Sequence, residues 1–472
     1  MNTFSLKKTW PVVALLGLAG CQPELDAPSV DKGSADFSSY VAIGNSLTAG
    51  FQSGGLANFG IETSYPAILA QQFAKAGGGD FVSPKFDEGQ KDGSGYLKFY
   101  GITTSGAPVI LQPGQSTSAT LAGETTARTF TNNLADYKFA FTGRPLPSGA
   151  AELAPFNTTQ PSNLGVPGIS VLSADRTAAL TGNPAVDASL RGAAQIYGNL
   201  NNYYHRLLPA ADRGATDYVT FIGRKNATFF TCWMGNNDVL TYATNGAVAA
   251  ATNPLGGLTD TTSFGRGYRN IVRTISKTGT VGGVVANIPN VTNVPYFTTV
   301  TVAGVLAGVQ RVNPAAPAVF IQPGATGAAV RAATAADLIT LPAASVVATG
   351  VGSSPTNPIP NNLVLDAAEI TAIQTRTTQL NNIIAKTARQ YKVGLVDMNS
   401  FFSTVALGGI AINATPNNAS FIRGNLFSLD GVHPTSRGYA VIANEFIKVI
   451  NATYGASIPQ VNPTEYNALL LP

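Results

Sequence analysis

The stretch Tyr-Val-Ala-Ile-Gly-Asn-Ser-Leu-Thr-Ala-Gly at residues 40–50 is the point from which the rest of the chain is interpreted. Its apolar residues 41–43 predict the end of a buried parallel strand. Gly44 permits a sharp turn that points Ser46 outward at the carboxyl end of that strand, the edge at which open α/β sheets bind ligands. Ser46 is therefore a candidate nucleophile, although a structural glycine and serine turn would also explain these residues.

Three other short stretches carry polar groups in comparable positions. The run 229–234 is continuously apolar, which predicts a second buried strand, and it leads directly into Gly-Asn-Asn-Asp at 235–238. A turn of small residues, Asn-Leu-Gly-Val-Pro-Gly, occupies 163–168. Asp-Gly-Val-His at 430–433 precedes a helix, and its spacing lets Asp430 reach Nδ1 of His433 and leaves Nε2 for the serine proton.

Taken in chain order, these four stretches resemble the signature blocks of the SGNH, or GDSL, hydrolases, which use a serine to cleave esters. The resemblance implies that Ser46 is the nucleophile, His433 the base and Asp430 the group that orients it. It also implies an oxyanion hole formed by the backbone N–H groups of Ser46 and Gly168 and by the side-chain amide of Asn237. Asp238 is expected to brace its turn.

Each of these residues also has a structural interpretation, since Gly168 and Asn237 could simply belong to turns. One position departs from the family pattern: Asn45 stands where the signature usually has aspartate, which removes a charge beside Ser46. This change leaves the pairing of Ser46 with His433 possible.

The pattern of helices and strands predicts an α/β fold with three layers, α/β/α, around a central and mostly parallel sheet. We expect helices near 65–74, 185–208, 262–276, 365–391 and after 434, with strands at 281–288 and 393–396. The domain is expected to span 38–456 and to be interrupted by two long insertions at about 77–160, which is predicted to be rich in β-structure, and 291–362. Residues 457–472 form a C-terminal tail in this scheme.

Residues 1–20 have the pattern of a secretory signal, because Lys7 and Lys8 precede a short apolar run. Its end, Leu-Ala-Gly followed by Cys21, resembles a bacterial lipobox, in which the cysteine is acylated. We therefore expect lipid attachment at Cys21, a tether at 21–37 and a place in the cell envelope, with the outer membrane favoured because Gln22 is not acidic. The alternative is an ordinary signal peptide with an incidental cysteine.

Composition fits a protein that works outside the cytoplasm. Charged residues are only 11% of the chain and the formal net charge is +4, so nothing indicates a nucleic-acid partner. The other cysteine, Cys232, lies in an apolar run and is expected in the core, which leaves no intrachain disulfide if Cys21 is acylated. His205 is expected at a surface or an interface. No zinc-like ligand spacing is present, so we expect neither a metal nor a cofactor.

The expected substrate is a small-molecule, lipid or glycan ester. Carbohydrate O-deacetylase, carboxylesterase and lysophospholipase activities all remain open, because fold analogy cannot choose among them. The alternative from another class is a catalytically silent envelope lipoprotein that binds a glycan or a partner protein in the same cleft.

Overall fold

A five-stranded parallel sheet forms the centre of the computed structural model, which describes residues 29–134, 136–146, 148–156, 160–249, 253–324 and 328–469. The strands follow one another across the sheet in the order β15 (Gly394–Val396), β10 (Gly282–Ala286), β9 (Phe229–Trp233), β1 (Tyr40–Gly44) and β8 (Asn163–Gly165). All four neighbouring pairs are parallel, and Ile43 lies opposite both Leu164 and Cys232. The predicted α/β fold with a mostly parallel sheet is confirmed.

Both faces of the sheet are buried, which explains why its strands are apolar at every position. Val41 and Ile43 of β1 enter one apolar cluster, whereas Tyr40 and Ala42 enter the cluster on the opposite face. This alternation follows from the two-residue period of a strand. Cys232 is fully buried in the first cluster, as expected.

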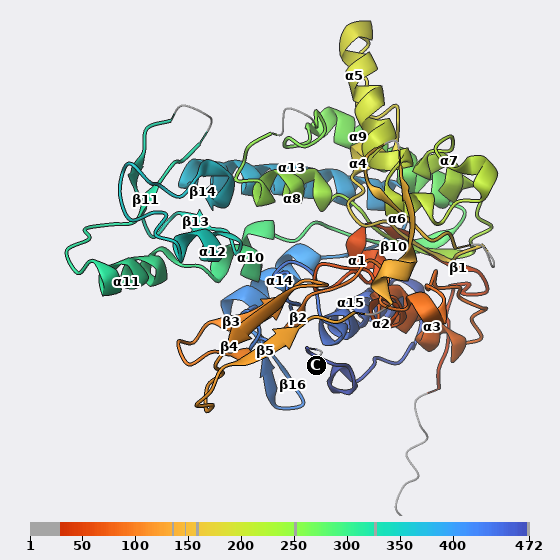
Figure 1. Ribbon diagram of the computed structural model, residues 1–472. Coiled ribbons are helices and arrows are strands. Elements are labelled where there is room, and N and C mark those ends of the chain that lie inside the picture. The colour runs from red at the N-terminus through yellow and green to blue at the C-terminus, as the bar shows by residue number, and fades with distance from the viewer. Residues whose placement is uncertain are drawn as a thin grey trace, which may run out of the picture.

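Helices cover the two faces and complete the predicted three layers (Figure 1). The first face carries α4 (Val171–Ala174), α7 (Tyr218–Gly223), α8 (Asn237–Thr244), α9 (Thr261–Ile275) and α13 (Ala367–Gln390). The second face carries α3 (Tyr65–Ala74) and α15 (Ser436–Tyr454). Side chains of the preceding residues cap the long helices: Asp260 caps α9, Asp366 caps α13 in a capping box, and Thr435 caps α15.

The first predicted insertion folds into three small antiparallel sheets that are separate from the central one. They pair β2 (Lys98–Ile102) with β3 (Pro108–Leu111), β4 (Ser116–Ala119) with β5 (Arg128–Thr131), and β6 (Phe141–Pro145) with β7 (Ala151–Leu153). A short 3₁₀ turn, η1 (Glu88–Gln90), precedes β2, and a second, η2 (Tyr137–Ala140), lies between β5 and β6.

A buried arginine fastens both ends of this insertion to the body of the domain. Arg206 is only 1% exposed, and its guanidinium donates to the carbonyl oxygens of Pro84, Lys85 and Ala154 while it lies over the ring of Phe86. Burial lowers the pKa of Arg206 to about 9. Three backbone carbonyls thus take the place of a carboxylate partner.

The neighbouring histidine is more enclosed than a surface position would allow. His205 is 9% exposed, and its Nδ1 lies 3.5 Å from Oε1 of Glu152 on β7. His205 was expected at a surface or an interface, and its burial contradicts a surface position. The helix predicted around it is also interrupted: α5 (Pro184–Ala194), the π-helical η3 (Gln195–Asn199) and α6 (Asn202–His205) follow in turn, because Asn201 caps a new helix.

The second predicted insertion is more regular than the sequence suggested. It contains η5 (Val291–Asn293), α10 (Pro295–Thr298), α11 (Val302–Val312), β11 (Phe320–Ile321), β12 (Arg331–Ala332), β13 (Leu338–Ile339), α12 (Ala343–Val347) and η6 (Asn361–Leu363), and β13 pairs with β14 (Val364–Leu365) just beyond it. Its own apolar cluster includes Val305, Val319, Ile321 and Ile339. The expected loss of regularity is corrected: well-spaced valines and isoleucines are enough to build a small separate core.

The ends of the described chain pack on the domain. Phe37 is buried and its ring stacks on Phe73 with centroids 4.0 Å apart, while Ser34 donates from its backbone to the carbonyl oxygen of Tyr454. The predicted tether at 21–37 therefore ends earlier than residue 37, because an apolar side chain near its end enters the core. In the predicted tail, Ile458 is buried and precedes η7 (Pro463–Glu465).

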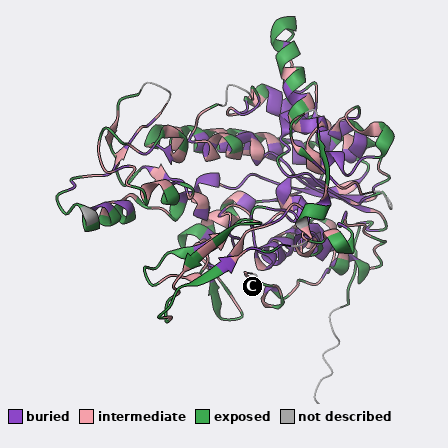
Figure 2. Cartoon of the chain, in the orientation of Figure 1, coloured by how far each residue is buried: buried purple, intermediate pink, exposed green. Residues whose placement is uncertain are grey.

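The remaining elements are α1 (Ser46–Ala49), α2 (Asn58–Glu62), η4 (Ala210–Asp212), α14 (Met398–Leu407), β16 (Ile410–Ile412) and β17 (Thr415–Asn417). Figure 2 shows that buried residues concentrate around the central sheet, whereas α5 projects from the body with an exposed surface. Within the described ranges, none of the helices has the length and apolar character needed to cross a membrane.

Candidate active site

Ser46 lies at the carboxyl edge of the sheet, in the first turn after β1. Asn45 caps the short helix α1, and Ser46 is its first residue. Gly44 is required at the end of β1, because a Cβ there would lie 2.0 Å from Oγ1 of Thr48 and 2.7 Å from the carbonyl oxygen of Trp233. The chain therefore turns tightly, and Ser46 is held with only 6% of its surface exposed.

His433 comes to Ser46 from the far end of the sequence. Its Nε2 lies 2.8 Å from Oγ of Ser46, and its Nδ1 lies 3.0 Å from Oδ2 of Asp430. The ring of Phe51 packs against the imidazole, with centroids 4.7 Å apart. The structure thus brings together the three residues that the sequence singled out as nucleophile, base and orienting carboxylate.

Asp430 is surrounded by hydrogen-bond donors. Its Oδ1 accepts from the backbone N–H groups of Val432 and His433 at 2.9 and 2.8 Å, and its Oδ2 accepts from the N–H of Gly54 at 2.8 Å. Burial alone would raise the pKa of this carboxyl, but the charge of His433 and these hydrogen bonds hold the pKa below its usual value. An ionised Asp430 favours the imidazole tautomer with its proton on Nδ1, which leaves Nε2 to accept from Ser46.

Gly168 and Asn237 follow the two strands that flank β1. The register places Gly44 beside Gly165 of β8 and beside Trp233 of β9, so both loops leave the sheet at the same edge as Ser46. Gly168 is exposed and has a φ of +82°, which favours glycine. Asn237 begins α8, and its Nδ2 donates to the carbonyl oxygen of Ile169 at 2.8 Å, next to Gly168.

Residues 298–446 match the family model GDSL-like Lipase/Acylhydrolase. The match supports the SGNH/GDSL hydrolase family for this chain. Its match contains Asp430 and His433 and begins beyond Ser46, Gly168 and Asn237. The match supports hydrolysis of ester bonds in general terms and suggests a small-molecule ester as substrate. No curated protein matches the chain.

Asn45, which stands where the family signature usually has aspartate, makes two side-chain hydrogen bonds, one as an acceptor and one as a donor. Its Oδ1 accepts from the N–H of Leu47 at 3.0 Å, and its Nδ2 donates to Oδ1 of Asn236 at 3.1 Å. An ionised aspartate could make the first bond but could not donate the second. Asn45 therefore joins the serine turn to the turn that carries Asn237, without adding a charge.

Asp238 joins the start of α8 to the segments of Val171 and Thr259, which agrees with its expected role of bracing the turn. Its Oδ2 accepts from the N–H of Val171 at 2.9 Å, and its Oδ1 accepts from Oγ1 of Thr259 at 3.1 Å. Burial raises the pKa of Asp238 to about 7. The loop that carries Gly168 is thereby attached to the start of α8.

Sequence reasoning missed the residues that fix the Asp430 loop of the acylhydrolase to the serine turn. Ser53 donates from its backbone to Oγ of Ser428 at 2.7 Å, and the next residue, Gly54, donates to Asp430. A glycine pair at 54–55, shortly after the serine block, was the available signal. Among the described residues, no group of three or more His, Cys, Asp or Glu side chains is placed to hold a metal ion.

Proposed function

We propose that the protein is a lipid-anchored serine hydrolase of the cell envelope that cleaves carboxylic esters. In this proposal Ser46, His433 and Asp430 form a catalytic triad. The observation that carries the proposal is the 2.8 Å contact between Oγ of Ser46 and Nε2 of His433. This distance is within the range for a hydrogen bond between a nucleophile and its general base.

Acylation begins when Oγ of Ser46 attacks the ester carbonyl carbon and its proton passes to Nε2 of His433. Asp430 stabilises the resulting imidazolium through Nδ1. The C–O bond to the alcohol then breaks, and His433 returns the proton to the leaving oxygen. In the second half, His433 takes a proton from water while the water oxygen attacks the acyl carbon. The bond from this carbon to Oγ of Ser46 then breaks, His433 returns the proton to Oγ, and the carboxylic acid is released.

The developing oxyanion is held by Asn237 Nδ2 and by the backbone N–H groups of Ser46 and Gly168. The N–H of Ser46 is at the first position of α1, where a helix offers no internal acceptor. One hydrogen of the Asn237 side-chain amide is donated to the carbonyl oxygen of Ile169, and the second hydrogen remains for the oxyanion. Neutral fixed donors suit this task because they need no proton exchange and little reorganisation.

The proposal is tested first with the purified protein and short acyl esters such as p-nitrophenyl acetate and butyrate. Wild-type protein is expected to hydrolyse them, and Asn237→Ala is expected to lower kcat by about 10²- to 10³-fold with little change in KM, because its amide acts mainly in the transition state. Asn237→Asp should be no better, since its charge repels the oxyanion. A wild-type kcat in folded Asn237→Ala would contradict the assigned role.

The lipid anchor rests on sequence, because Cys21 lies outside the described residues. The charged and apolar segment before it and the small residues that lead into it support processing as a lipoprotein. Acyl chains on Cys21 would hold the protein at a membrane without a spanning helix, and two chains make such binding stable. We place the protein at the outer membrane where the cell has one.

Cys21→Ser is expected to abolish incorporation of a palmitate analogue and to move the protein from the membrane fraction to the soluble fraction. The chain has two cysteines, so Cys232→Ala provides the matched control and should keep both properties. Fractionation of cells that express each variant measures the effect. Equal incorporation in Cys21→Ser and wild type would rule out this site of attachment.

A further inference from the structure

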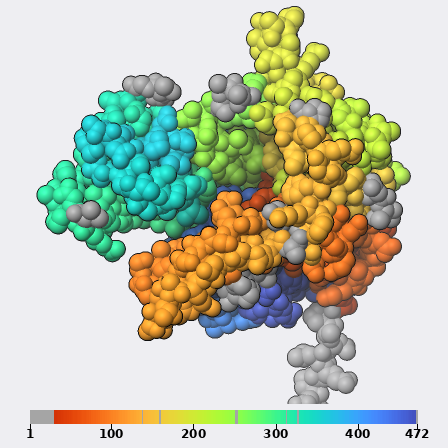
Figure 3. Space-filling model, viewed as in Figure 1, coloured from red at the N-terminus to blue at the C-terminus, as the bar shows by residue number. Residues whose placement is uncertain are grey.

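A mostly apolar groove lies between the two insertions. Its volume is about 550 Å³, and nine of its fifteen lining residues have apolar side chains, while Arg423 is the only charged one. Its walls come from the β2–β3 hairpin, α11, α12 and the loop at 421–423. Figure 3 shows the surface hollowed between the first insertion, in orange, and the second, in teal.

One wall of the groove touches the loop that carries the catalytic residues. Leu341 lines the groove, and a Cβ placed on Gly431 would lie 3.1 Å from Cδ2 of Leu341. Tyr296 joins the same two segments, because its N–H donates to the carbonyl oxygen of Gly431 and its carbonyl oxygen accepts from the N–H of Leu341. Gly431 is the residue after Asp430, so this wall of the groove contacts the loop that carries Asp430.

The opposite wall also starts at the active site and extends away from it. Leu97 donates from its backbone to the carbonyl oxygen of Ser53, next to the Gly54 that holds Asp430. Strand β2 follows at once, and its last residue, Ile102, lines the groove. Five residues of strand cover about 16 Å, so Ile102 lies about that far along β2 from the segment that holds the loop of Asp430.

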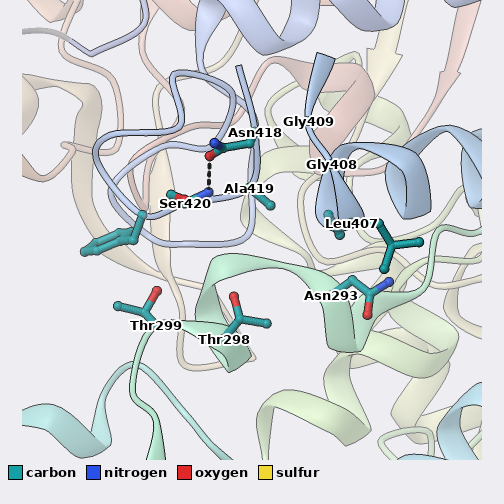
Figure 4. A pocket seen from close by; sticks show the side chains of 11 residues that line it. Asn293, Thr298, Thr299, Leu407, Gly408, Gly409, Asn418, Ala419 and Ser420 are labelled. Carbon is teal, nitrogen blue, oxygen red and sulfur yellow. Dashed lines mark hydrogen bonds between the residues drawn. The ribbon is translucent and has the colours of Figure 1, made fainter. Parts of the chain in front are cut away.

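Two details separate this groove from the hollow beside it. Ile422 lines the groove with a φ of +65°, a conformation that is rare for a β-branched residue and is found mainly at functional sites. The adjoining hollow, of about 650 Å³, shares Thr299 and Phe421 with the groove, but Asn293, Thr298, Asn418 and Ser420 give it a mixed lining of polar and apolar side chains (Figure 4). The groove therefore suits a hydrocarbon better than the hollow does.

We propose that this groove binds the acyl chain of the ester, so that the preferred substrates are esters of long unbranched fatty acids. The inference rests on the proposed function, since it extends the site of Ser46. An extended backbone advances about 3.5 Å over three bonds, so a hydrocarbon advances about 1.2 Å per carbon and needs about 13 carbons to follow β2. Acetyl groups do not reach the groove.

The experiment compares kcat/KM for p-nitrophenyl acetate, butyrate, octanoate, dodecanoate and palmitate. Each methylene that becomes buried is expected to raise kcat/KM by up to about fourfold, so dodecanoate should exceed butyrate by at least about 100-fold. Gly308→Trp fills the groove, because Gly308 lines it and a Cβ placed on this residue would have no atom within 4 Å. This variant should keep its butyrate rate and lose the advantage of dodecanoate.

Ala303→Trp is the matched control, since Ala303 is exposed on the same helix and does not line the groove. It should keep the wild-type dependence on chain length. Ala344→Asp, which places a charge in the groove wall, is a second variant and should act like Gly308→Trp. The proposal would be overturned if kcat/KM depended on acyl-chain length equally in Gly308→Trp and Ala303→Trp. It would also be overturned if kcat/KM depended on the alcohol instead of the acyl chain.

Binding of dodecanoate, measured by calorimetry, separates this inference from the proposed function. If no ester is cleaved but dodecanoate binds wild type and not Gly308→Trp, the proposed function fails and the apolar-chain site stands. If butyrate is cleaved in a reaction that needs Ser46 and longer chains bring no gain, the proposed function stands and the acyl groove is wrong.

Discussion

Ser46→Ala is expected to lower kcat on short acyl esters by about 10⁴- to 10⁶-fold, which leaves only the residual rate that binding and an oxyanion hole supply. The reason is chemical, because the acyl-enzyme cannot form without Oγ and His433 then has no nucleophile to activate. The fold should survive, since the change removes one oxygen whose hydrogen-bond partner, Nε2 of His433, can turn to water. Steady-state kinetics and thermal unfolding measure the two effects.

Ser64→Ala is the matched control for this change. Ser64 is fully buried, and its hydroxyl bonds to the carbonyl oxygen of Ile61 and to Nδ2 of Asn163, not to the reacting groups. Its loss should change stability by about 1 kcal/mol and leave kcat within a fewfold of wild type. If Ser46→Ala retained the wild-type rate, or if both variants lost activity equally, the role of Ser46 would be rejected.

Asp430→Asn is expected to lower kcat by about 10⁴-fold, because the amide favours the wrong tautomer of His433. Both oxygens of Asp430 accept from N–H groups: Gly54 and His433 Nδ1 on one side, Val432 and the backbone of His433 on the other. In either orientation, the side-chain amide of the substituted asparagine must therefore point its NH₂ group at another donor. The variant should also be less stable than wild type.

The pH dependence of stability provides a second measurement on this variant. The pKa of Asp430 is lowered in the folded state, so its ionised form contributes stability that is present above the unfolded value, about 3.9, and is lost as the pH falls through the lower folded value. Urea unfolding at acidic pH should show this loss in wild type, and Asp430→Asn should show less of it.

Asp238→Asn is the matched control, because the same substitution meets different neighbours there. The Asn oxygen can accept from Val171 while its NH₂ donates to Oγ1 of Thr259, a hydroxyl that also accepts. The pKa of Asp238 is raised to about 7, so the free energy of unfolding falls as the pH rises from the unfolded value, about 3.9, to about 7, and then levels off; Asp238→Asn should remove this loss. Its kcat should stay within about tenfold of wild type. Equal losses in both variants would contradict the orienting role of Asp430.

The central sheet could be predicted because its strands are buried on both faces and are apolar throughout, as β1 and β9 are. Part of the candidate site could be found because Ser46, Gly168 and Asn237 follow strands that end at one edge. Ser46 and His433 are far apart in sequence. From the sequence alone, they could be paired only because the stretches that contain them resemble the signature blocks of the SGNH/GDSL hydrolases.

The parts that could not be predicted depend on contacts between distant segments. Nothing near Arg206 in the sequence indicates the three carbonyl oxygens that it binds, and nothing near Phe37 indicates that it stacks on Phe73. The bond between Asn45 and Asn236 is of the same kind. The second insertion was misjudged because its core is built from isolated valines and isoleucines with no long periodic run.

Covalent labelling with a fluorophosphonate tests most directly whether Ser46 is an activated nucleophile, and it also separates an enzyme from a silent binding protein. Intact mass and peptide mapping of the folded protein should show one adduct, on the peptide that contains Ser46, and none in Ser46→Ala. An adduct on another serine, or no adduct on folded wild-type protein, would contradict the account.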